Sequence, residues 1–480
     1  MFVLFIYRGE EIKTIDRMAA DKGLDTFTLM ENAGRALFES VVKQVNKRQR
    51  ILILAGKGNN GGDGVVLARY LKQHGYTCEL AIPLGKPVSE TAERHYHYYL
   101  ECGFEVAEIG GTYDVLIDAL LGVGARLPLR DGIETLIDWM NEQQAFRIAV
   151  DIPTGVLADG GEVEKAIRAD QTCILHGYKP SAILNGSEEY YGQMEVLDIG
   201  LPQTSNWRVW TKEDVAASFP RRNAASHKGT FGTGLLIAGT DEMPGSAMLA
   251  SLAAMRSGIG KLTVATTKFT SGIIAGRVPE CTFLHGGLEK VAGGDMPKGM
   301  KSVAIGPGLD DEDMIERALN ELLKSDLPII IDAGALQKRR YPKREAMTIL
   351  TPHPGEFSRM TGIPTKDIQK DRLRLAVEYA TSNKVTVVLK GRNTVMAFPD
   401  GDVLVNETGN DGLAKGGTGD TLTGLLLAFT SYFEDKKAAV ANAVYCHGAS
   451  ADHWRETRAK ASLLASDVSE NLSYVLKEFE

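Results

Sequence analysis

A glycine-rich stretch near the carboxyl end, KGGTGDTLTG at residues 415 to 424, has the residue types of a phosphate cradle. Its glycines leave backbone N–H groups free to face an anion, and a helix that begins near Thr418 directs the positive end of its dipole toward the same point. The sequence contains no GxxxxGK[ST] loop, so the cradle is of another kind. Its single aspartate, Asp420, adds a carboxylate whose role the stretch alone leaves open.

A second glycine loop, AGKGNNGGDG at residues 55 to 64, directly follows a predicted strand. Its glycines match GxGxxG, the fingerprint of dinucleotide-binding oxidoreductases, in which Glu79 is the acidic residue expected to hold a ribose. However, Glu79 falls inside its strand, and the loop carries Asn59, Asn60 and Asp63, which a plain pyrophosphate cradle does not need. A tight strand-to-helix turn that binds nothing is the alternative interpretation.

Aspartates follow two other predicted strands. DVLIDALLGVGARLPLRDG places Asp118 at one strand end, and RIAVDIPTG places Asp151 at another. Ligands of parallel α/β sheets bind outside the carboxyl ends of the strands, so the three strand ends are expected to meet in one crevice. Each aspartate alone is typical of a helix cap or a turn. Together with the two asparagines and Thr154, they predict an oxygen-rich pocket for a hard cation and a polar substrate.

Four segments of the first half resemble the NAD(P)HX epimerase family, which interconverts the two epimers of hydrated NADH and NADPH. They are LMENAG (29–34), GKGNNGGDG (56–64), DALLGVGARLPLRDG (118–132) and VDIPTG (150–155). The resemblance implies a Rossmann-like fold, a catalytic Asp151, and a potassium ion held by Asn60, Asp118 and Thr154. It also implies that the hydrated dinucleotide contacts Asp151 and two loops, made of Asn59, Asn60, Gly61, Gly62, Asp63, Gly122, Val123, Gly124, Ala125, Arg126, Leu127 and Pro128.

This reaction needs a proton donor and a proton acceptor close to a ring hydroxyl and a ring nitrogen. A carboxylate beside a cation can serve if that setting tunes its pKa. Farther along, ADQTCILHGYKPSA (169–182) is similar to the closing strand of the family, but Leu175 and His176 stand where a phenylalanine is expected. We expect this departure to affect packing more than chemistry.

The second half contains an ordered set of motifs, each of which follows a strand or opens a helix. They are SHKGTFG (226–232), PGSAMLA (244–250), IGPGL (305–309), DAGAL (332–336), TPHPGEF (351–357), KGRNT (390–394) and GNDGLAKGGTGDTLTG (409–424). The last resembles the ribokinase-like superfamily, in which a GxGD turn supplies an anion hole and an aspartate base. The whole set resembles the ADP-dependent NAD(P)HX dehydratases, and its fusion to an epimerase domain is typical of the bifunctional NAD(P)H-hydrate repair enzymes.

The second resemblance implies that Asp420 accepts the proton of the substrate hydroxyl and that Glu356 orients a magnesium-bound water. Substrate contacts are implied for Ala247, Gly308, His353 and Asp420. Two loops are implied to bind ADP, with ATP as the alternative donor: Lys390, Gly391, Arg392, Asn393, Thr394, Asn410, Asp411, Gly412, Leu413, Ala414, Lys415, Gly416, Gly417, Thr418 and Gly419. The structural alternatives are a capping or core His353, a helix-start Glu356 and a solvated Lys390.

A nucleotide has a chemical use in such a dehydration, because hydroxide is a poor leaving group at neutral pH whereas phosphate is a good one. Phosphorylation of the C6 hydroxyl followed by elimination of phosphate regenerates the dihydropyridine and converts ADP to AMP and phosphate. This transfer depends mainly on positioning and charge stabilisation. Together, the two resemblances imply that the first domain epimerises R- and S-NAD(P)HX at C6 and that the second dehydrates the S form.

The candidate residues lie among short β-branched runs that alternate with helical stretches. This alternation predicts parallel sheets with crossover helices, which would position them. Strands are predicted at residues 50–55, 77–82, 114–119, 147–152, 234–239, 261–266, 302–306, 328–333, 348–352 and 386–390. Residues 201–231 lack clear periodicity, which predicts a domain boundary near residues 205–215. The expected architecture is α/β, with a Rossmann-like three-layer domain over residues 1–210 and a ribokinase-like α/β domain over residues 211–480.

Composition excludes several classes of protein. The chain has 480 residues, 44% hydrophobic and 24% charged, which favours a soluble protein of two or three domains. Its net charge of -8 argues against a nucleic-acid partner. The apolar start, MFVLFIYRGEEI, is too short to span a membrane and lacks a cleavage site. Five scattered cysteines without a CxxC pair indicate the reducing cytoplasm, and the resemblance implies a homo-oligomer that acts on small molecules.

Two other functions stay open. A small-molecule kinase of the hydroxyethylthiazole or pyridoxine type shares the GGTGD turn, although HPGE and the first domain argue against it. A non-enzymatic interpretation makes the first domain a nucleotide sensor or an oligomerisation module. The joint presence of Asn60, Asp118, Asp151 and Thr154 argues against a decayed site.

Overall fold

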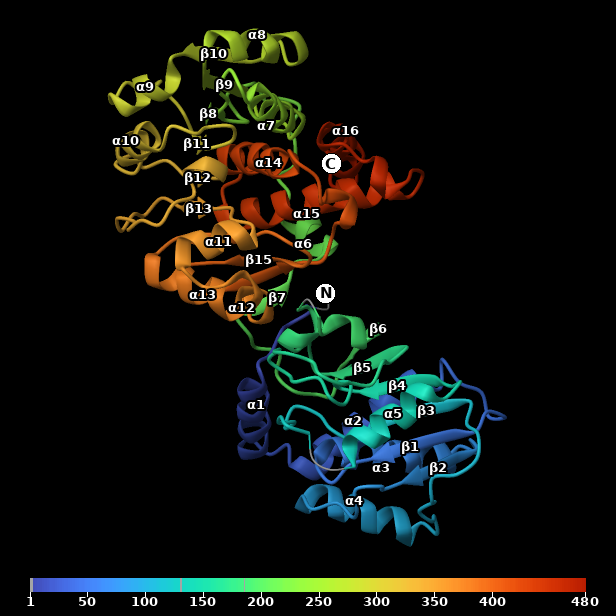
Figure 1. Ribbon diagram of the computed structural model, residues 1–480. Helices are drawn as coiled ribbons and strands as arrows, with labels where there is room; N and C mark the ends of the chain where they lie inside the picture. Colours follow the sequence, from blue (N-terminus) through green and yellow to red (C-terminus); the bar gives the residue numbers. More distant parts are fainter. Residues whose placement is uncertain (1–2, 130–131, 185) are drawn as a thin grey trace. The chain divides into compact units, whose positions relative to one another are not determined.

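The computed structural model describes residues 3–129, 132–184 and 186–480, which form two compact units, residues 3–205 and 206–480 (Figure 1). Two predicted segments extend outside the described residues: the apolar start includes residues 1–2, and DALLGVGARLPLRDG includes residues 130–131. Within the described ranges, we find no helix that is both long and apolar enough to cross a membrane.

The first unit is built on a parallel sheet. In its described residues the sheet has six strands in the order β2-β1-β3-β4-β5-β6. They are β1 (Ile51–Ala55), β2 (Cys78–Ala81), β3 (Val115–Ala119), β4 (Phe146–Val150), β5 (Gln171–Leu175) and β6 (Gln193–Leu197). The four strands predicted for this half are confirmed. The prediction that residues 169–182 hold the closing strand is wrong, because β6 pairs with β5 and forms the edge.

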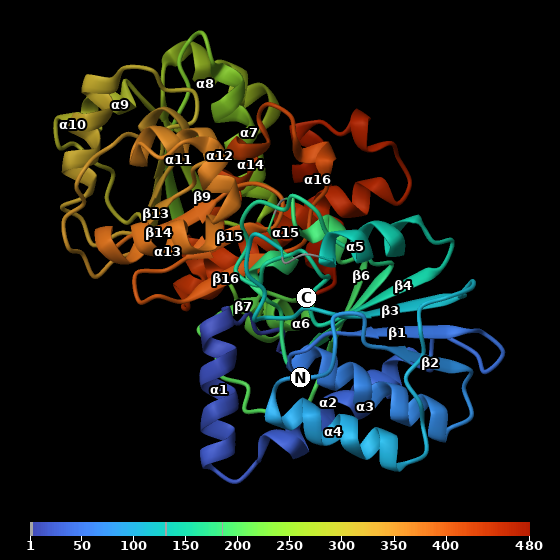
Figure 2. The same ribbon diagram turned by 60° about the horizontal axis from the view of Figure 1, so that its bottom comes forward.

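Helices cover both faces of this sheet, which gives the expected three layers (Figure 2). They are α1 (Gly9–Asp21), α2 (Thr26–Val41), α3 (Asn59–Gln73), α4 (Glu90–Glu101) and α5 (Ile133–Glu142), with short 3-10 helices at Pro180–Ala182 and Glu188–Tyr190. Ile51 and Ile53 pack in the core beneath α2 and α3, whereas Leu52 and Leu54 pack in the core beneath α5. Strands buried on both faces have continuous apolar sequences, which is why the sequence located them.

The second unit contains a larger, mostly parallel sheet. In its described residues the order of the ten strands is β10-β9-β8-β11-β12-β13-β14-β15-β16-β7, and only the hairpin pairings of β15 are antiparallel. The strands are β7 (Trp207–Val209), β8 (Thr233–Ile237), β9 (Lys261–Thr266), β10 (Thr282–His285), β11 (Ser302–Ile305), β12 (Ile329–Ile331), β13 (Thr348–Leu350), β14 (Thr386–Leu389), β15 (Thr394–Ala397) and β16 (Val403–Asn406). The six strands predicted for this half are all found.

The helices of the second unit also lie on both sides of its sheet. They are α6 (Lys212–Ser218), α7 (Pro244–Arg256), α8 (Lys268–Arg277), α9 (Gly287–Ala292), α10 (Glu312–Leu322), α11 (Pro354–Thr361), α12 (Thr365–Lys370), α13 (Arg372–Asn383), α14 (Thr418–Tyr432), α15 (Lys436–Arg455) and α16 (Ala465–Lys477). Figure 1 shows α9 and α10 on one side of the strands and α7 and α14 on the other. Helix α14 begins at Thr418, as predicted, and is buried on nearly all sides, which explains its almost unbroken apolar sequence.

The aperiodic stretch 201–231 is partly structured. Strand β7 pairs with β16, with Trp207 opposite Val403, so the second unit starts at Asn206. The indole of Trp210 is buried and donates a hydrogen bond to Asn442 Oδ1 at 2.8 Å. The three residues of β7 include Arg208 and form no continuous apolar run, so the sequence gives no strand signal there.

Candidate active sites

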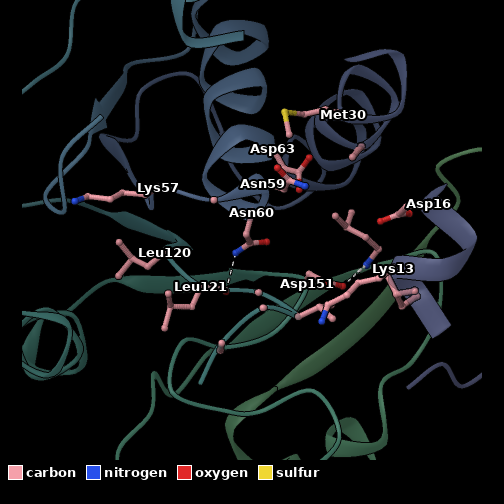
Figure 3. Close-up of a pocket in the computed structure, with 18 of the residues that line it drawn as sticks. Lys13, Asp16, Met30, Lys57, Asn59, Asn60, Asp63, Leu120, Leu121 and Asp151 are labelled. Atoms are coloured by element: carbon pink, nitrogen blue, oxygen red, sulfur yellow. Dashed lines mark hydrogen bonds between the residues drawn. The ribbon is translucent and has the colours of Figure 1, made fainter. Parts of the chain in front are cut away.

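A cavity of about 820 Å³ lies at the carboxyl ends of the strands of the first unit (Figure 3). Its walls come from the loops after β1, β3 and β4 and from α1, α2 and α3. Most of the residues predicted to contact the hydrated dinucleotide line it: Asn59, Asn60, Asp63, Gly122, Val123, Gly124, Ala125, Arg126, Pro128 and Asp151. The convergence of three strand ends on one crevice is therefore observed.

Three residues predicted for substrate contact, Gly61, Gly62 and Leu127, are not part of the cavity wall. A Cβ on Gly61 would lie 1.9 Å from the carbonyl oxygen of Gly56, and a Cβ on Gly62 would lie 2.5 Å from Met30 Sδ. Only glycine permits this close approach of α3 to the preceding loop and to α2. These two glycines therefore serve packing, and the side chain of Leu127 is 38% exposed.

A buried ion pair lies in the floor of the cavity. Lys179 Nζ contacts Asp151 Oδ1 and donates a hydrogen bond to Leu175 O at 2.9 Å. Leu175 N donates to the same carboxylate oxygen at 3.0 Å, and Asp151 has a positive φ of 66°, which is uncommon for a residue other than glycine. The segment GYKPSA gives no local sign of a role for Lys179, because the partner of Lys179 is 28 residues away in the chain.

We predict that Lys179→Met destabilises the first unit by about 3–5 kcal/mol, because it leaves an uncompensated carboxylate in the cavity floor. Hydrogen exchange of peptides from β4 and β5, compared with peptides from the second unit of the same chain, measures this effect. The double variant Lys179→Met with Asp151→Asn is expected to recover part of the lost protection, because the unpaired charge is gone. Equal protection in the single variant and the native chain would contradict the prediction.

The three residues predicted to hold potassium form one connected group. Thr154 Oγ1 and Thr154 N each donate to the carboxylate of Asp118 at 2.7 Å. Thr154 Oγ1 also accepts from Leu121 N at 3.0 Å, and Asn60 Nδ2 donates to Leu121 O at 2.8 Å. Asp118 is fully buried, and burial raises its pKa to about 6 despite the hydrogen bonds from Thr154. Within the described residues it has no basic partner, so a bound cation would offset its charge.

Two wall residues that the sequence did not assign are Asp16 on α1 and His176 after β5. Burial raises the pKa of Asp16 to about 6, with Lys179 opposing and Asp151 adding to the shift. His176 is 3% exposed, stacks on Tyr7 with ring centroids 4.5 Å apart, and has its pKa lowered to about 4 by burial. The expected packing role of His176 is thus real, but the residue also forms part of the cavity wall.

The oxidoreductase interpretation of the first glycine loop does not fit the structure. Glu79 lies within β2, where its carboxylate accepts hydrogen bonds from Arg50 Nη2 at 2.8 Å and from the hydroxyl of Tyr113 at 2.9 Å. These contacts lower the pKa of Glu79, and the hydrogen bond from Arg50 contributes most. They do not lie at the carboxyl end of the strand. Glu79 is therefore not placed to hold a ribose at that end.

A second cluster of charged groups lies at the carboxyl ends of β12, β13 and β14 in the second unit. Lys390 Nζ is 3.0 Å from Asp332 Oδ1 and 3.7 Å from Glu356 Oε2. Burial lowers the pKa of Lys390, but the charges of Asp332 and Glu356 outweigh it and raise the net pKa. Asp332 also accepts hydrogen bonds from the hydroxyls of Thr351 and Thr423, each at 2.7 Å. The ammonium group of Lys390 is thus fixed by ion pairs with Asp332 and Glu356 rather than solvated.

Asp420, in the first turn of α14, faces this cluster. Burial, with the charge of Asp332 next in size, raises the pKa of Asp420 to about 6, while the Ser246 hydroxyl, which hydrogen-bonds the carboxyl, and Lys390 oppose the shift. Ser246 lies against Gly308, where a Cβ would be 3.0 Å from Ser246 Cβ. The structure therefore brings Gly308 and Asp420 together through α7. Ala247 is fully buried and packs against Gly239, so its side chain does not face an open surface.

His353 and Glu356 form the start of α11 in a reciprocal cap. His353 Nδ1 accepts from Gly355 N at 3.0 Å and from Glu356 N at 3.2 Å, and Glu356 Oε2 accepts from His353 N at 2.7 Å. The capping interpretation is thus observed for both residues. The side chain of His353 nevertheless remains 56% exposed, whereas Glu356 reaches Lys390 and contributes to the raised pKa of Asp420, so capping also places the Glu356 carboxylate beside Asp420.

The turn between β14 and β15, one of the two loops predicted for ADP, is held by a buried arginine. Arg372 donates to Leu389 O at 2.8 Å, to Lys390 O at 3.1 Å and to Arg392 O at 2.6 Å. A Cβ on Gly391 would lie 2.8 Å from this guanidinium, so glycine is required there. Asn393 has a positive φ of 53°, and Thr394 Oγ1 closes the turn on Gly391 O at 2.9 Å.

The other loop predicted for ADP leads into α14. Asn410 Nδ2 donates to Ala451 O and Asp452 Oδ1, both at 2.9 Å, and Asp411, Gly412 and Leu413 form a 3-10 turn. Lys415 Nζ donates to Leu463 O at 2.6 Å and Ala461 O at 3.0 Å, so its charge is engaged by carbonyls. Ala414 and Gly416 continue toward the helix, and Gly416 has open space beside it. Gly417 has a positive φ of 90°, and Thr418 starts α14. A Cβ added to Gly419 would lie 3.3 Å from Lys390 Nζ.

Several contributors to the second cluster were missed in the sequence. Asp332 and Ser246 lie within the motifs DAGAL and PGSAMLA, whereas Arg372 lies in no motif. Asp332 lies 58 residues from its partner Lys390, and Arg372 lies 18 residues from the same lysine. Ser246 lies 174 residues from its partner Asp420. No local pattern announces such pairs.

The fold and the two clusters define the class of the protein. A Rossmann-like unit with an acidic, lysine-paired cavity is joined to a ribokinase-like unit whose GGTGD turn opens a buried helix. Residues 234–473 match the family model described as NAD(P)H-hydrate dehydratase, and residues 26–181 match the model described as YjeF-related protein N-terminus.

The chain belongs to the family of bifunctional NAD(P)H-hydrate repair enzymes. It is 32% identical over 518 aligned residues to the bifunctional NAD(P)H-hydrate repair enzyme of Moorella thermoacetica, with 99% of this chain and 97% of the relative covered. It is 30% identical to the Escherichia coli enzyme of that name over 98% of this chain and 94% of the relative. The predicted function, an epimerase unit joined to an ADP-dependent NAD(P)H-hydrate dehydratase unit, is thereby confirmed.

The second unit is also similar to proteins with a single activity. It is 51% identical to the ADP-dependent (S)-NAD(P)H-hydrate dehydratase of Bacillus subtilis, over 57% of this chain and 100% of the relative. The crystal structure of the ADP/ATP-dependent NAD(P)H-hydrate dehydratase from that organism, co-crystallized with ATP/Mg2+, matches with a TM-score of 0.56, 51% identity, and coverage of 57% of this chain and 98% of that chain. This likeness supports the ribokinase-like assignment of the second unit.

Proposed function

We propose that the second unit transfers a phosphoryl group from ADP to the C6 hydroxyl of S-NAD(P)HX and then releases phosphate, with Asp420 as the base. The observation that carries this is the placement of Asp420 in the first turn of α14, beside Lys390 and the glycines of the GGTGD turn. The backbone N–H groups at the start of α14 receive the transferred phosphate. Asp332 and Glu356 hold Lys390 at the edge of this anion hole, where its charge faces the phosphates.

Magnesium fits this site only together with the nucleotide. The described residues contain no group of three or more His, Cys, Asp or Glu side chains that could hold a metal alone. Magnesium is commonly held by one or two carboxylates and by substrate phosphates, and Glu356 supplies a buried carboxylate here. When bound, the ion neutralises phosphate charge. Glu356, fixed by His353 N, is the residue we propose to orient a water of its shell.

The raised pKa of Asp420 predicts an acid limb in the dehydratase reaction. Because Asp420 must be ionised to accept a proton, we expect kcat/KM to fall about tenfold per pH unit below its pKa of about 6 and to level off above it. Initial rates of dehydration between pH 5 and pH 8, with saturating nucleotide and magnesium, measure the profile. A rate that rises as the pH falls through this range, beyond the nonenzymatic rate, would contradict the assignment.

For the first unit, we propose epimerisation at C6 with Asp151 as the proton acceptor. Its carboxylate is fixed in the cavity by Lys179 and by Leu175 N, so it keeps one orientation toward a bound ring. We further propose potassium at the oxygen atoms of Asn60, Asp118 and Thr154. This donor set suits a hard cation, and the buried Asp118 carboxylate supports its presence. Asn60, Asp118 and Thr154 would hold the ion, whose charge would offset that of Asp118 in the loop that lines the cavity.

One experiment tests both activities. The chain is mixed with an epimer mixture of hydrated NADH, magnesium, potassium and either ADP or ATP, and the absorbance of reduced nicotinamide is followed. Full recovery supports both activities. Recovery that stops near the S fraction, beyond spontaneous epimerisation, contradicts the epimerase proposal, and no recovery contradicts the whole proposal. Replacing potassium with a larger organic cation is expected to slow only the phase that depends on the R epimer.

We also propose that the chain works as a homo-oligomer in the cytoplasm. Its cysteines are free thiols, and Cys78, Cys173, Cys281 and Cys446 are buried, which suits a reducing compartment. Light scattering coupled to size-exclusion chromatography gives the mass in solution, and a mass near 52.1 kDa at all concentrations would contradict an oligomer.

A further inference from the structure

Asp63 is a buried carboxyl group in the first unit that the proposed mechanism does not yet use. Inversion at a carbon that carries both a hydroxyl and a ring nitrogen needs a proton donor as well as an acceptor, and Asp151 supplies only the acceptor. Asp63 lines the same cavity and is 8% exposed. Its carboxyl forms no hydrogen bond or ion pair with any residue that the structure describes, so it is available to a ligand.

Helix α3 sets the position of this carboxyl group. The helix begins at Asn59, and Asp63 lies in its second turn, directly after the two packing glycines. The absence of a side chain on Gly62 lets the thioether of Met30 approach α3 at this level. Figure 3 shows Asp63 beside Met30, and shows Asp151 on a different wall of the cavity. A ring bound between these walls therefore has one carboxyl group toward each side.

The charges around the cavity make these two carboxyl groups unequal. Asp151 is paired with Lys179, whereas Asp63 is buried without a cationic partner among the described residues. Burial, then the negative charges of Asp151 and Asp16, raise the pKa of Asp63 well above its ordinary value, and Lys179 opposes this only in part. The other charged residues of the wall are all exposed: Lys13, Lys57 and Arg126. The surroundings of Asp63 therefore favour its protonated form, whereas Asp151 is held in an ion pair with Lys179.

We propose that Asp63 is the general acid of the epimerase site, a role that rests on the proposed epimerase function. The Asp151 carboxylate takes the proton of the C6 hydroxyl, and the electron pair of that O–H bond forms the C6=O double bond. The C6–N1 bond breaks, its electron pair stays on N1, and Asp63 donates its proton to N1. After rotation about C5–C6, N1 attacks the other face of the aldehyde and both protons return. No electrons, water or co-reactant are consumed.

Ring opening fits the two-unit chain better than loss of hydroxide does. Loss of hydroxide in the first unit would already produce the dehydrated cation, one proton away from the reduced cofactor. A separate unit that uses a nucleotide to expel the same hydroxyl group would then be unnecessary. Ring opening keeps the oxygen on C6, so it only interchanges the epimers and leaves dehydration to the second unit.

The test compares Asp63→Asn with the native full-length chain. Asparagine keeps the shape but has no acidic proton, so kcat for epimerisation is expected to fall on the order of 10²- to 10⁴-fold, with KM within about threefold of the native value. The decline of kcat/KM with rising pH, which reports the loss of the Asp63 proton, is expected to disappear. Asp63→Glu is expected to restore that decline. A native rate in Asp63→Asn, or a loss confined to KM, overturns the proposal.

Asp16→Asn gives a second readout that does not depend on the folding of Asp63→Asn. Removing one neighbouring negative charge lowers the pKa of Asp63, so the alkaline decline is expected to move to lower pH. Asp21→Asn, an exposed position at the end of the same helix, is the matched control and should not move it. An unchanged profile in Asp16→Asn overturns the proposal. If the native chain itself does not epimerise, the proposed function fails, whereas native epimerisation with an active Asp63→Asn removes only the acid assignment.

Discussion

Asp420→Asn is expected to reduce the nucleotide-dependent dehydration of S-NAD(P)HX on the order of 10²- to 10⁴-fold, the usual contribution of a general base. The amide preserves the shape of the side chain and its contact with Ser246, but it cannot accept the hydroxyl proton. Because the pKa of Asp420 is raised by burial to about 6, removing the carboxylate also relieves an unfavourable buried charge, so the fold should be retained. Recovery of reduced-nicotinamide absorbance from pure S epimer measures the rate.

The matched control for this variant is Asp326→Asn. Asp326 is exposed and precedes β12, so it lies at the amino end of the sheet, away from the cluster. Its replacement should leave dehydration unchanged. Epimerisation should be unchanged in both variants. If Asp420→Asn retained more than about a tenth of the native rate, Asp420 would not be the general base.

Asp151→Asn is the second variant with a large expected effect. It should reduce epimerisation on the order of 10²- to 10⁴-fold, because the neutral amide cannot take the hydroxyl proton. The buried ammonium of Lys179 keeps its hydrogen bond to Leu175 O and its attraction to the nearby carboxyl group of Asp16, so the first unit should remain folded. With an epimer mixture and an active second unit, absorbance should recover rapidly to the S fraction and then only at the spontaneous rate.

The control for Asp151→Asn is internal to the chain. Dehydration of pure S epimer should proceed at the native rate, which shows that the protein is intact. If epimerisation and dehydration both failed without unfolding, the assignment of one carboxylate to each activity would be wrong. Rapid recovery of the whole mixture would remove Asp151 from the reaction.

Buried strands and helix starts preceded by glycines are the elements that the sequence predicted correctly. The strands at 50–55 and 386–390 were located because both faces of a parallel sheet are covered, so the strands are short uninterrupted apolar runs. The start of α14 at Thr418 was located because glycines before an apolar helix leave a recognisable boundary. In contrast, β7 was not predicted because Arg208 interrupts its apolar residues, and β6 was not predicted because an edge strand with a partly exposed sequence lacks the apolar run.

The candidate sites divide in the same way. Asp151, Asp118 and Asp420 could be proposed from the sequence because strand ends and helix starts are local features, and parallel strands bring their carboxyl ends to one edge. The roles of Lys179, Asp16 and Asp332 could be assigned only from the residues that they contact in the structure. Likewise, His353 could be assigned both as a helix cap and as an exposed ring beside Glu356 only after its contacts were known.

Residue order alone was sufficient for the two-unit α/β architecture, the family resemblance and the aspartates at the strand ends, because hydrophobic runs and glycine turns act over a few neighbouring residues. The tertiary structure decided how differently these carboxyl groups are surrounded. Asp151 has a lysine 28 residues away and Asp63 has none among the described residues. The pKa of a carboxyl group depends on burial and on charges that are close in space, and neither is a property of the neighbouring sequence.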